Sequence, residues 1–336
     1  MKILSSIILI LSSSLIIGEE LELTTLMRQC GKKFGSMINR TVIWNDTDVT
    51  YRDVAGGLDF ATVTLFQKQS YIGPGIIDLH TQDKVIQLCQ DSGITDIRLH
   101  LLLSELPEWM VDLPRYMKWY YIKEYFQYVM NYYQGIVTYY DVVNHPWLLG
   151  EEFEESLGSG YIDSAFTWAS EIDPNCKLIL NETYKHGIKE KYREWFNKTC
   201  STVVDLQSKN IPIHGIGMQM HTYTIKRFNQ HIFKVYIDSL NSLGMEVLLS
   251  EVDVIIDTPF TEIKYELQAD RYCYVLDLCL SSPNVTVFNL WDFSDRYTWS
   301  TTVSDGEYGA ACIYDKEYNL KLCYYEMIKW ISRRDN

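Results

Sequence analysis

Short apolar runs rich in β-branched and aromatic residues recur along the chain, and they alternate with longer stretches whose apolar residues recur at helical spacing. Glycine or proline marks several of the boundaries between the two kinds of stretch. Residues 86–94 and 265–278 show the helical spacing clearly. The runs that predict strands are Phe34–Ile38, Phe60–Leu65, Ile97–Leu103, Tyr139–His145, Lys177–Glu182, Ile213–His221, Val247–Val254 and Val285–Trp291.

This alternation predicts an α/β fold. Continuous apolar strands separated by helices indicate a parallel sheet that is covered on its faces. Eight such strands within about 300 residues fit a closed (β/α)8 barrel. A doubly wound open sheet is the alternative, but no glycine-rich phosphate loop follows the first run. Because no low-complexity linker divides the chain, we expect a single barrel domain over residues 19–336.

The first 18 residues have the pattern of a secretory signal peptide. Lys2 is followed by an apolar run, Ile3 to Ile17, that only serines interrupt, and Gly18 ends it. A membrane anchor is the alternative, but the run is shorter than the roughly 18 residues that a spanning helix needs. No later run is long enough, so we expect a secreted, extracellular protein without a membrane segment.

Charge and composition exclude some partners. The formal net charge of −14 leaves no broad basic face, so neither nucleic acid nor an acidic membrane surface is an expected partner. Aromatic residues make up 14% of the chain, including nine tryptophans, and such side chains suit a groove that stacks on sugar rings. We expect no metal ion and no cofactor.

The cysteines and the glycosylation motifs agree with secretion. Eight cysteines without a CxxC pair or zinc-like histidine spacing favour disulfides over metal binding. Cys176 with Cys200, and Cys312 with Cys323, are the candidate pairs. Asn-x-Ser/Thr motifs occur at Asn39, Asn45, Asn181, Asn197 and Asn284.

Two strands carry polar groups where apolar residues are expected. The run Tyr139–His145 ends in His145, and Glu251 interrupts the apolar run Val247–Val254. A buried carboxylate is costly unless it is paired or functional. In a barrel the carboxyl ends of strands four and seven meet at one rim, which is where a retaining glycosidase places two groups roughly 5–5.5 Å apart.

From about residue 23 to residue 331 the chain resembles glycoside hydrolase family 10, the β-1,4-xylanase family. The run 141–144 matches the first four residues of the family motif Asp-Val-Val-Asn-Glu, and His145 stands where the family has its acid/base glutamate. The run 250–253 is similar to the family's Thr-Glu-Leu-Asp, which gives Glu251 the position of the nucleophile.

Two further motifs extend the resemblance. Residues 215–221 are similar to Gly-Ile-Gly-x-Gln-x-His, whose histidine contacts the nucleophile, and residues 291–299 resemble Trp-Gly-Val-x-Asp-x-x-x-Trp. The resemblance implies a polysaccharide or oligosaccharide ligand. The substrate-binding residues that it implies are Asn144, Gln219, His221, Trp291 and Trp299.

The chain also departs from the family. In the family, a Pro-Glu-Asn sequence and a lysine after the second strand hold sugar hydroxyls, and the third-strand signature ends in Trp-His. In this chain His100 is at most a displaced remnant of that histidine. The glycone side of the cleft is therefore expected to be stripped. The residues that replace the family's polar groups are Leu65, Phe66, Gln67, Ser70, Leu102 and Leu103.

Two interpretations follow from His145. A charged imidazole near Glu251 could donate a proton, which gives a retaining hydrolase of xylan-type polysaccharide with an impaired or unusual acid/base. Alternatively, His145 pairs with Glu251 or Asn144 in an inactive cleft, and the protein binds a glycan or a protein partner. The acidic run 151–155 predicts a solvated helix start rather than a substitute acid.

Overall fold

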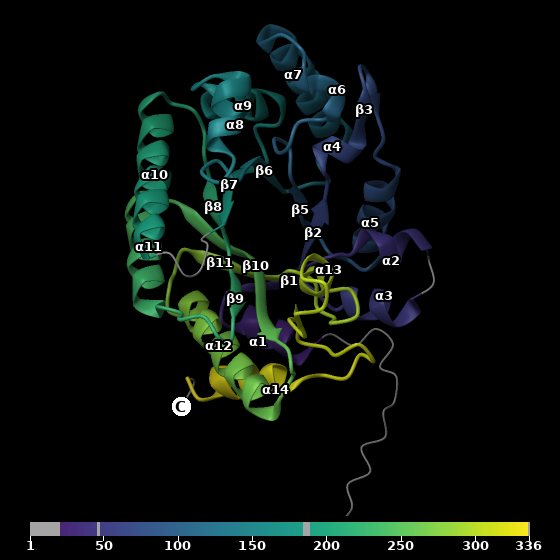
Figure 1. The fold of residues 1–336 in the computed structure, drawn as a ribbon, viewed down its shortest axis with the longest axis vertical. Helices are drawn as coiled ribbons and strands as arrows, with labels where there is room; N and C mark the ends of the chain where they lie inside the picture. Colours follow the sequence, from purple (N-terminus) through teal and green to yellow (C-terminus); the bar gives the residue numbers. More distant parts are fainter. Residues whose placement is uncertain (1–20, 46–47, 184–188, 335–336) are drawn as a thin grey trace, which may run out of the picture.

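The structure is a computed structural model that describes residues 21–45, 48–183 and 189–334. Eight parallel strands close into a barrel with helices around it, so the predicted (β/α)8 fold is confirmed (Figure 1). The barrel strands, in chain order, are β1 (Lys33–Met37), β2 (Phe60–Thr64), β5 (Asp96–His100), β6 (Tyr139–Asn144), β7 (Lys177–Thr183), β8 (Gly215–Gln219), β10 (Glu246–Asp257) and β11 (Val285–Leu290).

The barrel closes where β1 pairs in parallel with β11. Phe34 lies opposite Phe288, and on its other side β1 pairs with β2, where Gly35 lies opposite Phe60. A Cβ atom on Gly35 would lie 2.3 Å from the carbonyl oxygen of Phe60. Glycine at this position therefore allows the close approach of the two strands.

The helices include the two segments that helical spacing predicts, as α5 and α12. The acidic run 151–155 lies in α8 with its four glutamates exposed, as expected. The helices are α1 (Glu22–Gln29), α2 (Arg40–Asn45), α3 (Val49–Ala55), α4 (Gln67–Ser70), α5 (His80–Asp91), α6 (Glu108–Val111), α7 (Arg115–Tyr132), α8 (Gly150–Leu157), α9 (Tyr161–Ile172), α10 (Lys189–Ser208), α11 (Gln230–Ser242), α12 (Glu262–Leu280), α13 (Trp299–Val303) and α14 (Leu322–Ser332).

Four short strands lie outside the barrel proper: β3 (Tyr71–Gly73), β4 (Ile76–Ile77), β9 (His221–Tyr223) and β12 (Tyr308–Gly309). Two of the predicted strands end two or more residues before their predicted ends. The third ends at His100, before its predicted end at Leu103, and the sixth is interrupted at Met220, so that His221 begins β9. His221 pairs with Asp253 of β10 in parallel register.

The barrel interior is divided into an apolar and a polar layer. One compact cluster comprises side chains from alternate positions of five strands, namely Phe60, Tyr139, Ile179, Leu248 and Val287. Farther along the same strands, toward their carboxyl ends, the inward side chains become polar. A larger cluster of apolar side chains fills the space between strands and helices and provides most of the core.

The structure does not confirm the predicted disulfides, because neither candidate pair of cysteines is joined in it. Cys176 directs its sulfur toward the carbonyl oxygen of Asp173, at 3.1 Å, and Cys323 faces the carbonyl oxygen of Cys312 instead of its sulfur. The signal peptide predicted at residues 1–18 lies outside the described residues. None of the helices in the described ranges is long and apolar enough to cross a membrane.

Candidate functional site

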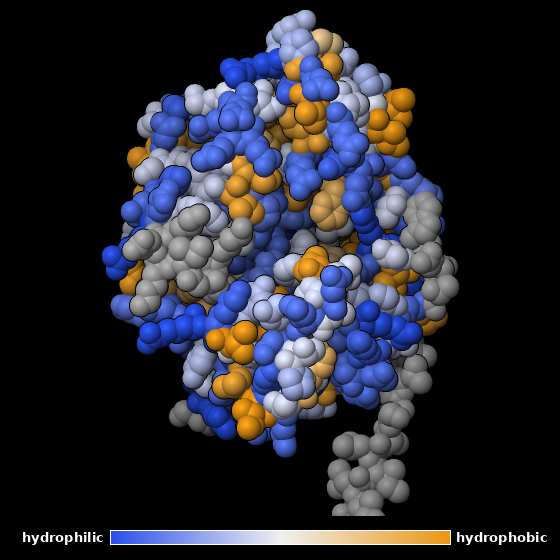
Figure 2. Space-filling model, in the orientation of Figure 1, coloured by the Kyte–Doolittle hydropathy of each residue, from blue (hydrophilic) through white to orange (hydrophobic). Residues whose placement is uncertain are grey.

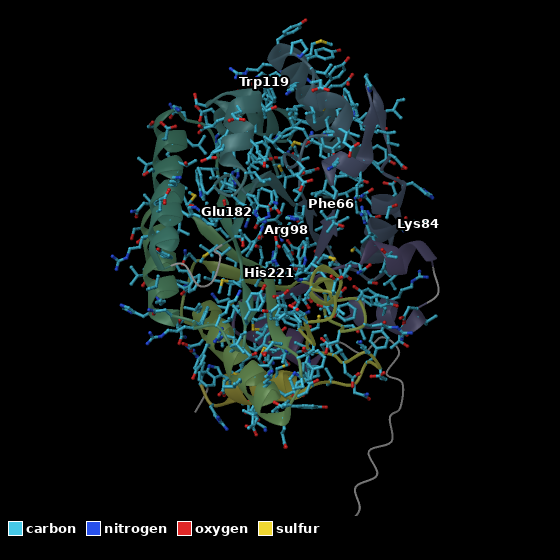
Figure 3. All side chains as sticks on the ribbon, in the orientation of Figure 1. Phe66, Lys84, Arg98, Trp119, Glu182 and His221 are labelled. Atoms are coloured by element: carbon cyan, nitrogen blue, oxygen red, sulfur yellow. The ribbon has the colours of Figure 1, made fainter. Side chains whose placement is uncertain are left out.

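A hollow opens in the middle of the face toward which Figure 2 looks, and hydrophilic side chains line much of it. Figure 3 places Arg98, Glu182, His221 and Phe66 in the middle of the same view, and Arg98 and Glu182 are fully buried beneath the surface there. Glu251 of β10 is 3% exposed and is the centre of the polar network here. Its Oε1 atom accepts a hydrogen bond from Asn181 Nδ2 (2.9 Å), and its Oε2 atom lies 3.0 Å from His221 Nε2.

The surroundings of Glu251 keep its carboxylate ionised. Burial raises the pKa, but the hydrogen bond from His221 and the positive charges of His100, His221 and Arg98 outweigh burial and lower the pKa of Glu251 to about 2. Arg98 NH2 and His100 Nε2 lie 3.9 and 3.8 Å from Glu251 Oε1. Glu251 is therefore a negatively charged carboxylate at neutral pH.

His221 connects this carboxylate to a second one. Its Nδ1 atom lies 2.9 Å from Asp253 Oδ2, and the same oxygen accepts a hydrogen bond from Trp299 Nε1 at 2.7 Å. Burial lowers the pKa of His221, but Asp253 and Glu251 together raise it to about 10. The ring is consequently an imidazolium that donates to both carboxylates and fixes the orientation of Glu251.

A β-bulge brings the polar groups of β10 into the barrel. The register of β10 against β11 shifts between Leu249 and Val252. Ser250 donates to Asn181 Oδ1 at 2.8 Å, and the adjacent Glu251 also contacts Asn181, so two consecutive side chains point toward the interior. Bulges of this kind redirect side chains next to active sites.

Asn144 and Gln219, both predicted site residues, belong to the same network. Asn144 Oδ1 accepts hydrogen bonds from Asn181 Nδ2 (2.8 Å) and from Gln219 Nε2 (3.1 Å). Gly217 makes room for this arrangement, because a Cβ atom there would lie 2.1 Å from Asn181 Oδ1. The structure therefore brings Asn144, Gln219, His221 and Glu251 together around Asn181.

The two predicted tryptophans lie beside the histidines. The Trp291 ring meets His100 edge to face, with ring centroids 5.2 Å apart, and approaches His221 at 6.1 Å. The Trp299 ring lies 5.0 Å from that of His221. Both tryptophans are partly exposed, so each offers ring surface to a ligand.

His145 corrects the expectation that it pairs with Glu251 or Asn144. It directly follows β6 and has a positive φ of 56°, and its Nδ1 atom lies 3.4 Å from Glu182 Oε1. Glu182 is fully buried, and its carboxylate also accepts hydrogen bonds from the backbone amides of Trp147 (2.7 Å) and Thr183 (2.6 Å). His145 is therefore paired with Glu182, whereas Glu251 is paired with His221.

Sequence reasoning missed the buried ion pair that supports the polar layer. Arg98 and Asp141 are fully buried, and Arg98 Nε donates to Asp141 Oδ1 at 3.0 Å, while NH1 donates to the carbonyl oxygen of Ser250 at 3.0 Å. His100 also pairs with Asp141, so it belongs to the same buried network. An arginine and a histidine two residues apart in an apolar strand were the available signal.

Five of the six residues expected to replace the family's sugar-binding groups are buried, and Phe66 is partly exposed. Leu65, Leu102 and Leu103 belong to the core, and Gln67 is also fully buried. Ser70 Oγ lies 2.8 Å from the hydroxyl of Tyr125. Phe66 lies at the opening (Figure 3), with the guanidinium of Arg40 over its ring at 4.9 Å.

The described residues include no group of three or more histidine, cysteine, aspartate or glutamate side chains placed to hold a metal ion. The arrangement is a barrel whose polar centre lies at the carboxyl ends of the strands, as in barrel enzymes generally. Its chemistry is that of an oriented, ionised carboxylate beside an imidazolium and two aromatic rings. These features define the class of protein as a (β/α)8 barrel with a carboxylate site.

The chain belongs to Glycosyl hydrolase family 10, whose family model matches residues 22–330. Endo-1,4-beta-xylanase B of Thermotoga neapolitana is 33% identical over 193 residues, which cover 55% of this chain and 54% of that protein. Endo-1,4-beta-xylanase of Agaricus bisporus is 33% identical over 189 residues, 55% of each protein. The chain thus aligns with about half the length of these curated relatives.

Solved structures show the same fold. Xylanase 10B from Thermotoga petrophila, in complex with xylobiose, superposes with a TM-score of 0.83 at 24% identity, covering 95% of this chain and 99% of that one. Native xylanase 10B from Thermotoga maritima has a TM-score of 0.83 at 25% identity, covering 94% of this chain and 99% of that one.

Proposed function

We propose that this protein is a glycoside hydrolase that cleaves β-1,4-linked polysaccharide of the xylan type with retention of configuration. The observation that carries the proposal is Glu251, a carboxylate kept ionised and oriented by His221 and Asn181 at the carboxyl end of β10. The relatives support the substrate class, because their names describe endo-1,4-beta-xylanases.

In the proposed reaction Glu251 is the nucleophile. One of its oxygens attacks the anomeric carbon and forms a covalent glycosyl-enzyme, which water then hydrolyses. His221 keeps the carboxylate in its attacking orientation, while Asn144 and Gln219 line the floor beside it. Trp291 and Trp299 offer ring faces to the bound sugar.

The sugar is held differently from the family pattern in this proposal. The buried leucines at positions 65, 102 and 103 offer no hydrogen-bonding groups to a glycone. Affinity for a single terminal sugar should accordingly be low, and binding should depend on stacking against the aromatic rings. We therefore expect oligosaccharides that span the cleft to bind better than xylose or xylobiose.

We also infer that the protein is secreted. The apolar leader over residues 3–17 supports this route, as do the glycosylation motifs. Asn197 is exposed on α10 and suits a glycan. Asn181 does not, because it is fully buried and its amide donates to Asn144 and Glu251.

One observation favours a second candidate, a non-catalytic protein that binds a glycan or a protein partner. His145 stands where the resemblance puts the family's acid/base glutamate, and it contacts Glu182 instead of Glu251. In that case the aromatic rim would bind ligand without turnover.

Hydrolysis of an activated aryl β-xylobioside and of xylan tests the two candidates. Glu251→Gln should lower kcat on the aryl substrate by about 10³-fold or more, as loss of a nucleophile does. The matched control is Glu246→Gln, which changes a carboxylate at the start of the same strand. If the natural chain shows no Glu251-dependent turnover of either substrate, the hydrolase proposal is wrong.

A further inference from the structure

The ends of β6 and β7 carry a second carboxylate–imidazole pair beside the Glu251 network. Glu182 is fully buried, and the backbone amides of Trp147 and Thr183 hold its two oxygens. His145 Nδ1 approaches the Oε1 atom at 3.4 Å, and the His145 side chain remains 24% exposed. A fixed, buried carboxylate thus lies behind a histidine ring that reaches solvent.

The pair is close to the proposed nucleophile. Asn144 immediately precedes His145. Asn181 Nδ2 donates to Asn144 Oδ1 (2.8 Å) and to Glu251 Oε1 (2.9 Å), so Asn181 links Asn144 to the proposed nucleophile. The His145 amide donates to the carbonyl oxygen of Asn181 at 3.0 Å, which ties the rim of β6 to β7. Figure 3 shows Glu182, Arg98 and His221 in the same central part of the barrel, where Glu182 and Arg98 are fully buried.

We propose that His145 is the general acid and base of this hydrolase and that Glu182 is its positioning residue. This inference rests on the proposed function. A buried carboxylate that accepts from Nδ1–H fixes the tautomer of an imidazole, stabilises the imidazolium and leaves Nε2 to exchange a proton with the substrate. No described residue hydrogen-bonds to His145 Nε2. The positive φ of His145 turns its side chain out of the strand's alternation, toward the rim.

The proton balance is complete within the site. As Glu251 forms its bond to the anomeric carbon, the bond from that carbon to the leaving oxygen breaks, and the oxygen takes the proton from Nε2 of the His145 imidazolium. The neutral imidazole then removes a proton from water, whose oxygen attacks the anomeric carbon. Glu251 leaves as a carboxylate, and His145 is again an imidazolium.

The groups packed around the pair leave Glu182 as its counter-charge. From α9, the Tyr161 hydroxyl donates to the carbonyl oxygen of Pro146 at 3.2 Å. Burial, with the nearby charges of Glu154 and Glu182, raises the pKa of Tyr161, so this hydroxyl stays neutral. Glu154 of α8 is exposed and therefore screened by solvent.

The test compares leaving groups. We expect His145→Gly to slow cleavage of xylan and of phenyl β-xylobioside by about 10²-fold or more. The same change should slow formation of the glycosyl-enzyme from dinitrophenyl β-xylobioside far less, because dinitrophenolate leaves without a proton. Glycine tolerates the positive φ of residue 145 and leaves space for azide. Azide should accelerate breakdown of the glycosyl-enzyme and yield a glycosyl azide.

Glu182→Gln should reproduce the dependence on leaving group more weakly and move the alkaline limb of the pH profile to lower pH. If Glu182 had a purely structural role, Glu182→Gln would instead lower the unfolding temperature and slow cleavage of substrates with good and poor leaving groups equally. Glu246→Gln serves as the control for loss of a carboxylate. Equal slowing of good and poor leaving groups by His145→Gly, without azide acceleration, would overturn the dyad and leave the hydrolase intact. Absence of Glu251-dependent cleavage of the dinitrophenyl substrate would overturn both proposals.

Discussion

His221 Nε2 lies 3.0 Å from Glu251 Oε2, while its Nδ1 atom lies 2.9 Å from Asp253 Oδ2. The imidazolium of His221, the first residue of β9, thus joins two carboxylates of β10. Because all three groups are mostly buried, their charges stabilise one another strongly and hold Glu251 in a single orientation.

The stability of the protein should depend on pH through this pair. The pKa of Glu251 is lowered from 4.5 to about 2, so its contribution is present above pH 4.5 and is lost as the pH falls through about 2. The pKa of His221 is raised from 6.5 to about 10, so its contribution is present below pH 6.5 and is lost as the pH rises through about 10. We expect the free energy of unfolding lost in Glu251→Gln to be greatest between pH 4.5 and 6.5, at about 3 kcal/mol. Urea unfolding at several pH values measures it, and a loss independent of pH would contradict the assignment.

Asp292 should destabilise the folded chain at neutral pH. Burial raises its pKa from 3.8 to about 6, although the amides of Phe293 and Ser294 and the side chains of Asn39 and Tyr51 lower it. A raised carboxyl pKa means that the ionised form is disfavoured in the fold, so the penalty grows as the pH rises from 3.8 through about 6. Asp292→Asn should raise stability by about 1–2 kcal/mol at pH 8 and by little at pH 4.

Asparagine is suitable at this position because Asp292 has φ 70°, which asparagine tolerates. Thermal unfolding of the two proteins at both pH values makes the comparison. Equal effects at pH 4 and pH 8 would show that charge is not the cause.

The Arg98–Asp141 pair should be costly to break from one side. Arg98→Met removes the guanidinium from Asp141, which keeps only His100 beside it in the barrel interior, and should cost about 3–5 kcal/mol. Replacing both partners with apolar residues should cost less than the single change, since no uncompensated charge remains. The exposed pair Lys234–Asp238 is the control, where Asp238→Asn should cost less than about 1 kcal/mol. Urea unfolding of the single and double variants checks the order.

Gly217→Ala should disturb the site through Asn181. The added Cβ atom would lie 2.1 Å from Asn181 Oδ1, so the amide must move away from Glu251 and Asn144. We expect a loss of about 1–3 kcal/mol in stability, together with a fall in kcat on the aryl glycoside. At Gly150 a Cβ atom meets nothing within 4 Å, so Gly150→Ala is the control. Unchanged turnover in Gly217→Ala would mean that Asn181 does not position Glu251.

Much of the barrel could be predicted because it follows from local pattern. The eight apolar runs and the helical spacing between them depend only on which positions are buried, so the strands appear within a few residues of their predicted bounds. The exceptions are informative. The third strand ends early, at His100, although the leucines that follow are apolar, because they enter the core between strands and helices.

The site was predicted in part. Glu251, His221, Gln219 and Asn144 carry a motif, and the structure places them in one network. Asn181 and Arg98 were not selected, although an arginine and a histidine two residues apart in an apolar strand were a local signal for Arg98. The structure does not confirm the candidate disulfides, because spacing along the chain does not determine where two sulfurs point.

The sequence by itself determined the (β/α)8 fold and the placement of a carboxylate on the seventh barrel strand, because both follow from periodicity and residue type. Only the tertiary structure decided which groups meet. It pairs His145 with Glu182 and joins Asn144 to Glu251 through Asn181, because a β-bulge and the inward glycine at position 217 determine the direction of these side chains. Hydrogen bonds extend only about 3 Å, so these details of backbone path select each partner.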